Sequence, residues 1–153
     1  MGLAIGSLAP DFTLHDHTRA KFVLSQTLQD KAVLLVFYPF AFSGVCTGEL
    51  TGFRDHLGEV ETEVSTLVAV SCDPAFSLRA FADRDALFFP LLSDFWPHGA
   101  VASDYDVFDP ALGAVRRSSY LIKRDGTIAW AMHHEIGEAR DLGAHAAAIR
   151  ALG

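Results

Sequence analysis

The sequence contains little of what stabilises disulfide-rich domains, metal-dependent domains or membrane spans. Two of its 153 residues are cysteines, too few for a disulfide framework or a four-thiolate metal site. Basic residues are also scarce, because 12 Lys and Arg stand against 19 Asp and Glu. The resulting net charge of −7 argues against nucleic acid or an anionic membrane surface as a partner. No apolar run approaches the length of a transmembrane helix.

The sequence also shows no sign of a domain boundary or of a secretory signal. Residues 1–6 carry no basic side chain ahead of the Pro10-Asp11 segment, so no secretory signal is expected. We find no internal repeat, low-complexity tract or flexible linker. The hydrophobic content of 50% is enough for a conventional core. We therefore predict one domain over residues 1–153, in the cytoplasm of a bacterium.

Cys46 is the most informative residue that is present. It follows the apolar run Ala32–Tyr38, whose length predicts a strand buried on both faces and ended by Pro39. Residues at the spacing of one helical stripe come next: Cys46, Leu50, Phe53 and Leu57. Ser43 stands three positions before the cysteine, as an N-cap hydroxyl stands before the N–H that it accepts. Cys46 is thus expected in the first turn of a helix.

The start of a helix changes the chemistry of a thiol. Unpaired backbone N–H groups and the positive end of the helix dipole favour the thiolate, which is the nucleophilic form. The alternative is that Cys46 is one more small buried hydrophobe, the commoner fate of a cytosolic cysteine.

The rest of the pattern predicts an α/β fold. Short strands at Asp11–Leu14 and Lys21–Leu24 form an N-terminal hairpin. Thr66–Ser71 is a second apolar strand, and the helix after it is capped by Asp73, with Pro74 at its first position.

A second hairpin and a helix are expected near the C-terminus. Strands over Val115–Lys123 and Thr127–Met132 flank an Asp125-Gly126 turn. A closing helix then carries the apolar positions Leu142, Ala146 and Ile149. An additional helical loop around Trp96 is expected between the helix after Thr66–Ser71 and this second hairpin.

The pattern Pro39-x-x-x-Ser43-x-x-Cys46 resembles the active-site motif of the peroxiredoxins, which are thiol peroxidases. Three other segments resemble the family in the right order: Ala9-Pro10-Asp11-Phe12-Thr13-Leu14, Ser93-Asp94-Phe95-Trp96-Pro97-His98-Gly99-Ala100-Val101 and Arg117-Ser118-Ser119-Tyr120-Leu121-Ile122. The second of these is similar to the AhpE group of one-cysteine peroxiredoxins from actinobacteria. The resemblance covers nearly the whole chain and implies a thioredoxin-like fold with an N-terminal β-hairpin extension.

The resemblance also implies a role for each residue of the motif. Cys46 is the peroxidatic cysteine, Ser43 fills the usual Thr/Ser position and Pro39 shields the thiol. Arg117 is the family's distant arginine, and Glu49 orients that arginine through a charge-assisted hydrogen bond. Each of these residues has a plainer interpretation as well. Ser43 could serve only as a helix cap and Pro39 only as the end of a strand. Arg117 could form a surface ion pair, and Glu49 could be a solvated helix residue.

Arg116 competes with its neighbour for the arginine role. The spacing Arg117-x-x-Tyr120 fits the family better, so Arg117 is the preferred candidate.

The implied activity is reduction of hydrogen peroxide, organic hydroperoxides or peroxynitrite, with Cys46 converted to a sulfenic acid. An external thiol or redoxin, namely mycothiol with mycoredoxin, or thioredoxin, would regenerate the thiol. No cofactor or metal is implied. A homodimer is expected from the family, with Phe42, Phe95 and Trp96 as apolar contacts.

Two alternatives remain within thiol chemistry. Cys72 ends the second apolar strand and would resolve the sulfenic acid in an atypical two-cysteine enzyme, although a disulfide needs Cα atoms within about 7 Å. The other alternative is a peroxide sensor with little turnover. A thioredoxin-type oxidoreductase is disfavoured because no Cys-x-x-Cys is present. The seven His residues suggest no metal site by spacing.

Overall fold

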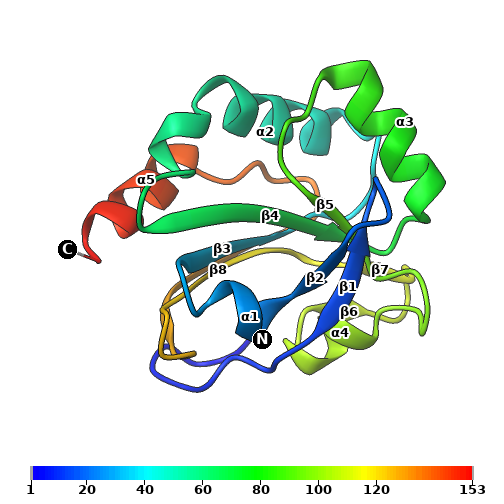
Figure 1. Ribbon diagram of the computed structural model, residues 1–153. Coiled ribbons are helices and arrows are strands. Elements are labelled where there is room, and N and C mark those ends of the chain that lie inside the picture. Colours follow the sequence, from blue (N-terminus) through cyan, green and yellow to red (C-terminus); the bar gives the residue numbers. More distant parts are fainter. Residues whose placement is uncertain (1, 153) are drawn as a thin grey trace.

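A seven-stranded mixed sheet runs through the computed structural model, which describes residues 2–152 (Figure 1). Its strands lie in the order β2-β1-β5-β4-β3-β8-β9. Their bounds are β1 Thr13–Asp16, β2 Lys21–Val23, β3 Ala32–Phe37, β4 Ser65–Ser71, β5 Leu91–Ser93, β8 Arg117–Ile122 and β9 Ile128–His134. The central strand β3 pairs in parallel with β4 and antiparallel with β8. A separate short ribbon joins β6 (Phe108–Asp109) to β7 (Ala114–Val115).

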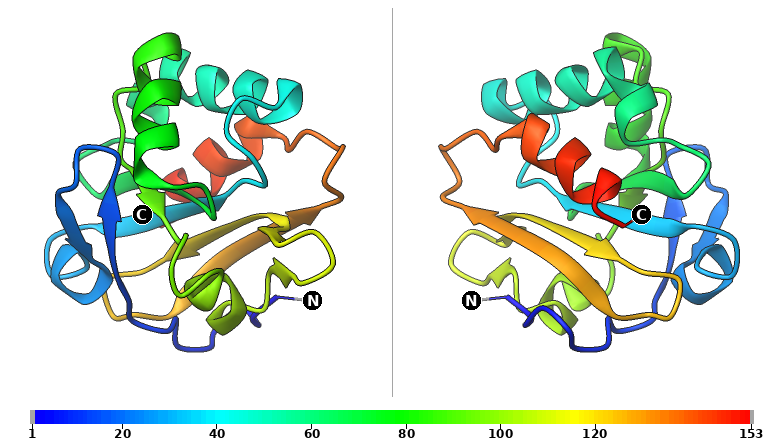
Figure 2. Two further views of the ribbon diagram at one scale, coloured as in Figure 1. Left: turned by 90° about the vertical axis from the view of Figure 1, so that its right-hand side faces the viewer. Right: turned by 90° about the vertical axis from the view of Figure 1, so that its left-hand side faces the viewer.

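Helices cover both faces of this sheet (Figure 2). One face carries α2 (Gly44–Asp55), α3 (Ala75–Asp85) and α5 (Leu142–Arg150). The other carries α1 (Leu24–Thr27) and α4 (Ala100–Asp104). A single 3₁₀ turn, η1 (Leu57–Glu59), follows α2. Two apolar cores therefore lie on either side of one sheet.

Strand β3 shows why the sheet is central. All of its residues are buried, and they alternate between the two cores. Val33, Leu35 and Phe37 face the α1 and α4 side, whereas Ala32, Leu34 and Val36 face α2, α3 and α5. The prediction of a strand buried on both faces is confirmed, and so is the α/β class.

Several predicted boundaries shift by a few residues. The first strand begins at Thr13 rather than Asp11, because the Asp11 carboxylate accepts hydrogen bonds from the N–H groups of Phe12 and Ser25. The stripe after Cys46 ends early, since α2 stops at Asp55 and Leu57 lies in η1. Strand β5 and the β6–β7 ribbon were not predicted, because they are very short.

The predicted cap of α3 is wrong. Pro74, not Asp73, occupies the N-cap position, and no side chain caps that helix. The Asp73 carboxylate instead accepts hydrogen bonds from the Ala41 N–H at 2.8 Å and from the Ser71 hydroxyl at 2.7 Å. Asp73 therefore anchors the loop that leads from β3 into α2.

Within residues 2–152, no helix is both long and apolar enough to cross a membrane.

Candidate active site

Cys46 lies in the first turn of α2, where the sequence pattern placed it. Ser43 is the N-cap residue, and its side-chain oxygen accepts a hydrogen bond from the Cys46 N–H at 3.3 Å. The Cys46 side chain is fully buried. Pro39 is buried between the end of β3 and this turn of the chain. The thiol of Cys46 therefore lies at the positive end of α2, beside the first N–H groups of that helix.

Arg117 reaches the same thiol from strand β8 of the seven-stranded sheet. It begins β8, is 1% exposed, and donates from Nη2 to Cys46 Sγ at 3.4 Å. Its Nε and Nη2 also donate to the Ile136 carbonyl, at 3.2 and 2.7 Å. A surface ion pair is therefore excluded for Arg117. Arg116, the competing candidate, is half-buried and lies just before the strand.

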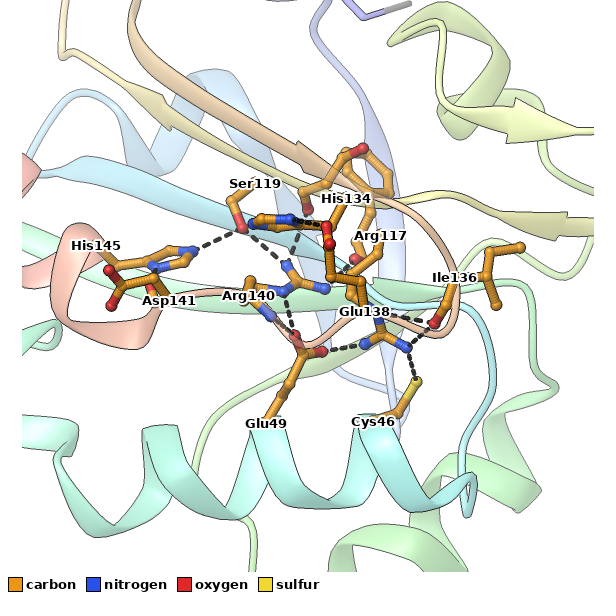
Figure 3. A network of polar contacts seen from close by, with 12 residues as sticks. Cys46, Glu49, Arg117, Ser119, His134, Ile136, Glu138, Arg140, Asp141 and His145 are labelled. Atoms are coloured by element: carbon orange, nitrogen blue, oxygen red, sulfur yellow. Dashed lines mark hydrogen bonds and ion pairs between the residues drawn. The ribbon is translucent and has the colours of Figure 1, made fainter.

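Glu49 lies one helical turn after Cys46 on α2 (Figure 3). Its side chain is buried, so the interpretation as a solvated helix residue is wrong. Its Oε1 accepts a hydrogen bond from Arg117 Nη1. Its Oε2 accepts two more, from the backbone N–H of Arg140 at 2.7 Å and from Arg140 Nε at 2.9 Å. One carboxylate thus holds two guanidinium groups in place.

Arg140 and Ile136 are site residues that the sequence analysis missed. Both belong to the segment between β9 and α5, which contains no motif spacing that would single them out. Arg140 also donates to the carbonyl oxygens of Ser118 and Phe37. The loop before α5 is therefore tied to β3, β8 and α2 at once.

The buried cluster around Cys46 contains more positive than negative charge on its arginine and glutamate side chains. Among residues 2–152, the hydrogen bonds and ion pairs of the Arg117 and Arg140 guanidinium groups reach one carboxylate, that of Glu49. Two positive charges and one negative charge are therefore buried together. An uncompensated buried charge is costly, so these surroundings favour the binding of negative charge beside Arg117.

Cys72 lies on the opposite side of the sheet from Cys46. Its side chain belongs to the core under α1 and α4, whereas Cys46 belongs to the core under α2, α3 and α5. Burial, reinforced by the carboxylates of Asp94 and Asp73, raises the pKa of Cys72 to about 12. Cys72 is therefore a protonated, packed thiol, and the sheet separates it from Cys46.

Several of the histidines take part in hydrogen bonds with neighbouring residues. His17 Nδ1 accepts from the Leu91 N–H at 3.3 Å, and His133 Nδ1 lies 2.9 Å from the Ser118 hydroxyl. His134 pairs with Glu138. In the described part of the chain, no three His, Cys, Asp or Glu side chains gather as a metal ion would require.

Comparisons with known proteins agree with this geometry. A model of the AhpC/TSA family matches residues 5–131. Alkyl hydroperoxide reductase E of Mycobacterium tuberculosis is 44% identical over 139 residues, which cover 91% of each chain. The crystal structure of peroxidoxin BcpB from the same species is 32% identical, with a TM-score of 0.87 over 99% of both chains. Enterococcus faecalis AhpC is 26% identical, with a TM-score of 0.88 over 99% of this chain and 93% of that one.

The thioredoxin-like fold predicted from the sequence is confirmed by these structural neighbours. Fold and relatives together define a thiol-dependent peroxidase of the peroxiredoxin class. The chain belongs to the AhpC/TSA family, and its similarity to alkyl hydroperoxide reductase E supports the AhpE type within it.

Proposed function

We propose that Cys46 is the peroxidatic residue of this thiol peroxidase. Its thiolate attacks one oxygen of a hydroperoxide, an S–O bond forms and the O–O bond breaks. The cysteine becomes a sulfenic acid, and the other oxygen leaves as alkoxide or hydroxide and takes up a proton. The observation that carries the proposal is the contact of 3.4 Å between Cys46 Sγ and the buried Arg117 guanidinium.

The surrounding residues fit the charge that develops in this reaction. Negative charge spreads from sulfur over both peroxide oxygens, and donors held in advance stabilise it best. Arg117, the Cys46 N–H and the Ser43 hydroxyl are the proposed donors. Pro39 shields the thiol from water, and Glu49 orients Arg117 through their buried ion pair.

Regeneration is proposed to use a thiol from outside the chain. The position of Cys72 across the sheet from Cys46 supports a one-cysteine cycle. The proposed reductants are mycothiol with mycoredoxin, or thioredoxin, acting in the cytoplasm. Steady-state peroxide consumption with each reductant tests this step, and the absence of turnover with all of them would favour the peroxide sensor instead.

The defining experiment is the intact mass of the reduced protein after one equivalent of hydrogen peroxide, with and without a sulfenic-acid trap. We expect a gain of one oxygen, or of one trap molecule, on the peptide that contains Cys46. Loss of two hydrogens with a Cys46–Cys72 linkage would contradict the one-cysteine cycle. An unchanged mass would contradict the whole proposal.

A homodimer is proposed on the basis of exposed aromatic side chains. Trp96 is 81% exposed, Phe76 is 76% exposed, and Phe42 and Phe95 are partly exposed as well. Phe76, Phe95 and Trp96 line one open groove together with Pro74. Sedimentation velocity of the full chain tests the proposal: we expect a dimer, and a monomer at all accessible concentrations would contradict it.

A further inference from the structure

His145 lies in the first turns of α5 with its ring completely enclosed, and the proposed mechanism gives it no role. The ring packs edge-on against Trp130 of β9, with a centroid distance of 4.9 Å, and against Phe53 of α2 at 5.2 Å. A histidine in such surroundings must have both ring nitrogens satisfied. Through their own hydrogen bonds, the partners of those nitrogens connect the ring to the residues around Cys46.

The hydrogen bonds of the ring define which nitrogen carries the proton. Nδ1 lies 2.8 Å from the carbonyl oxygen of Asp141, which can only accept, so Nδ1 holds the hydrogen. Nε2 is then an acceptor, and it lies 2.8 Å from the Ser119 hydroxyl. Ser119 therefore donates to His145.

The same hydroxyl accepts a hydrogen bond from Arg140 Nη1 at 2.8 Å. Because Ser119 both accepts and donates, its hydroxyl has one orientation only (Figure 3). Arg140 in turn donates to the Glu49 oxygen that does not bind Arg117. An ordered series of hydrogen bonds thus runs from His145 through Ser119, Arg140, Glu49 and Arg117 to the sulfur of Cys46.

Burial keeps the ring neutral. Burial first, and then the neighbouring Arg140 cation, lower the pKa of His145 to about 4. Glu49 of α2 and the Asp141 carboxylate at the start of α5 act in the opposite direction, while Trp130 and Phe53 contribute no charge. The acceptor at Nε2 is therefore available across the neutral pH range.

We infer that His145 is a positioning residue of the peroxidase centre: with Ser119 it holds Arg140 against Glu49, so that Arg117 faces the sulfur of Cys46. The inference rests on the proposed function of Cys46. Buried hydrogen-bond networks hold charged groups in place when every member has its partners. The position of Arg117 at Cys46 therefore depends in part on a residue of α5.

The test uses two substitutions of His145 and one matched packing control. His145→Leu removes the acceptor, His145→Gln keeps an acceptor oxygen where Nε2 lies, and Trp130→Phe loosens the packing on the same ring without touching the hydrogen bonds. Two quantities are measured on protein whose fold is verified by circular dichroism. One is the single-turnover rate constant of Cys46 oxidation, and the other is the pH at which the ultraviolet absorbance of the Cys46 thiolate appears.

We expect His145→Leu to slow oxidation by about tenfold and to move the appearance of the thiolate to higher pH. His145→Gln is expected to restore both quantities toward those of the unmodified protein, and Trp130→Phe to lower the melting temperature alone. An unchanged rate in His145→Leu, or an equal loss in Trp130→Phe, would overturn the inference. The proposed function itself fails only if the unmodified protein shows no oxidation at Cys46, so the two failures are distinguishable.

Discussion

Replacement of Cys46 by serine is expected to abolish peroxide reduction while leaving the fold intact. Serine keeps the N-terminal position in α2 and nearly the same volume, but its hydroxyl does not ionise near neutral pH as a thiol can. Loss of a nucleophile lowers turnover by about 10⁴-fold or more in enzymes that depend on one. The measurement is peroxide consumption, in a single turnover and in the steady state with an added thiol reductant.

Cys72 supplies the matched control for this experiment. Cys72→Ser removes the other thiol of the chain, which is buried on the far side of the sheet. We expect single-turnover oxidation at the unmodified rate, followed by normal recovery with external thiol. Residual activity in Cys46→Ser, or loss of recovery in Cys72→Ser, would be incompatible with a one-cysteine cycle at Cys46.

Replacement of Arg117 by alanine is expected to slow oxidation of Cys46 by about 10²-fold, the usual effect of removing a donor that stabilises developing negative charge. Lysine at position 117 keeps the charge but not the planar fork, and can reach fewer of the partners that Arg117 holds. Arg117→Lys should therefore recover only part of the rate. Stopped-flow measurement of the oxidation step separates this effect from any change in regeneration.

Folding has to be checked in these variants, because Arg117→Ala leaves Glu49 with one guanidinium partner instead of two. Breaking a buried ion pair costs about 3–5 kcal/mol of stability. Arg117→Lys reduces this risk, and Arg116→Ala serves as the control at the adjacent position. Equal oxidation rates in folded Arg117→Lys and unmodified protein, together with a slow Arg116→Ala, would assign the arginine role to Arg116.

The strand–loop–helix unit around Cys46 was predictable because its determinants are local. The apolar run before Pro39 can only be buried, and a hydroxyl three residues ahead of Cys46 satisfies an N–H at the helix start. Both features were confirmed, with Ser43 as the observed cap. The failed assignment of Asp73 has the opposite cause, since the Ala41 N–H from another loop competes for its carboxylate.

The partners of Cys46 could be named only with the help of the family resemblance. Arg117 is 71 positions away in sequence from the thiol, and Arg140 is 91 positions from Glu49. The antiparallel pairing of β3 with β8 brings the first of these pairs together. The local sequence around an arginine does not indicate whether the arginine will be buried. Sequence pattern alone therefore does not identify which arginine contacts Cys46.

The sequence by itself determined the α/β order, the two-sided burial of the central strand and the placement of one thiol at a helix start, because each depends on neighbours within a few residues. Only the tertiary structure decided that Glu49 is buried between two arginines, that Cys72 faces the other core, and that His145 connects to the site. Those outcomes depend on which faces of distant elements meet. Burial then makes each charge and each polar hydrogen require a partner, wherever in the chain that partner lies.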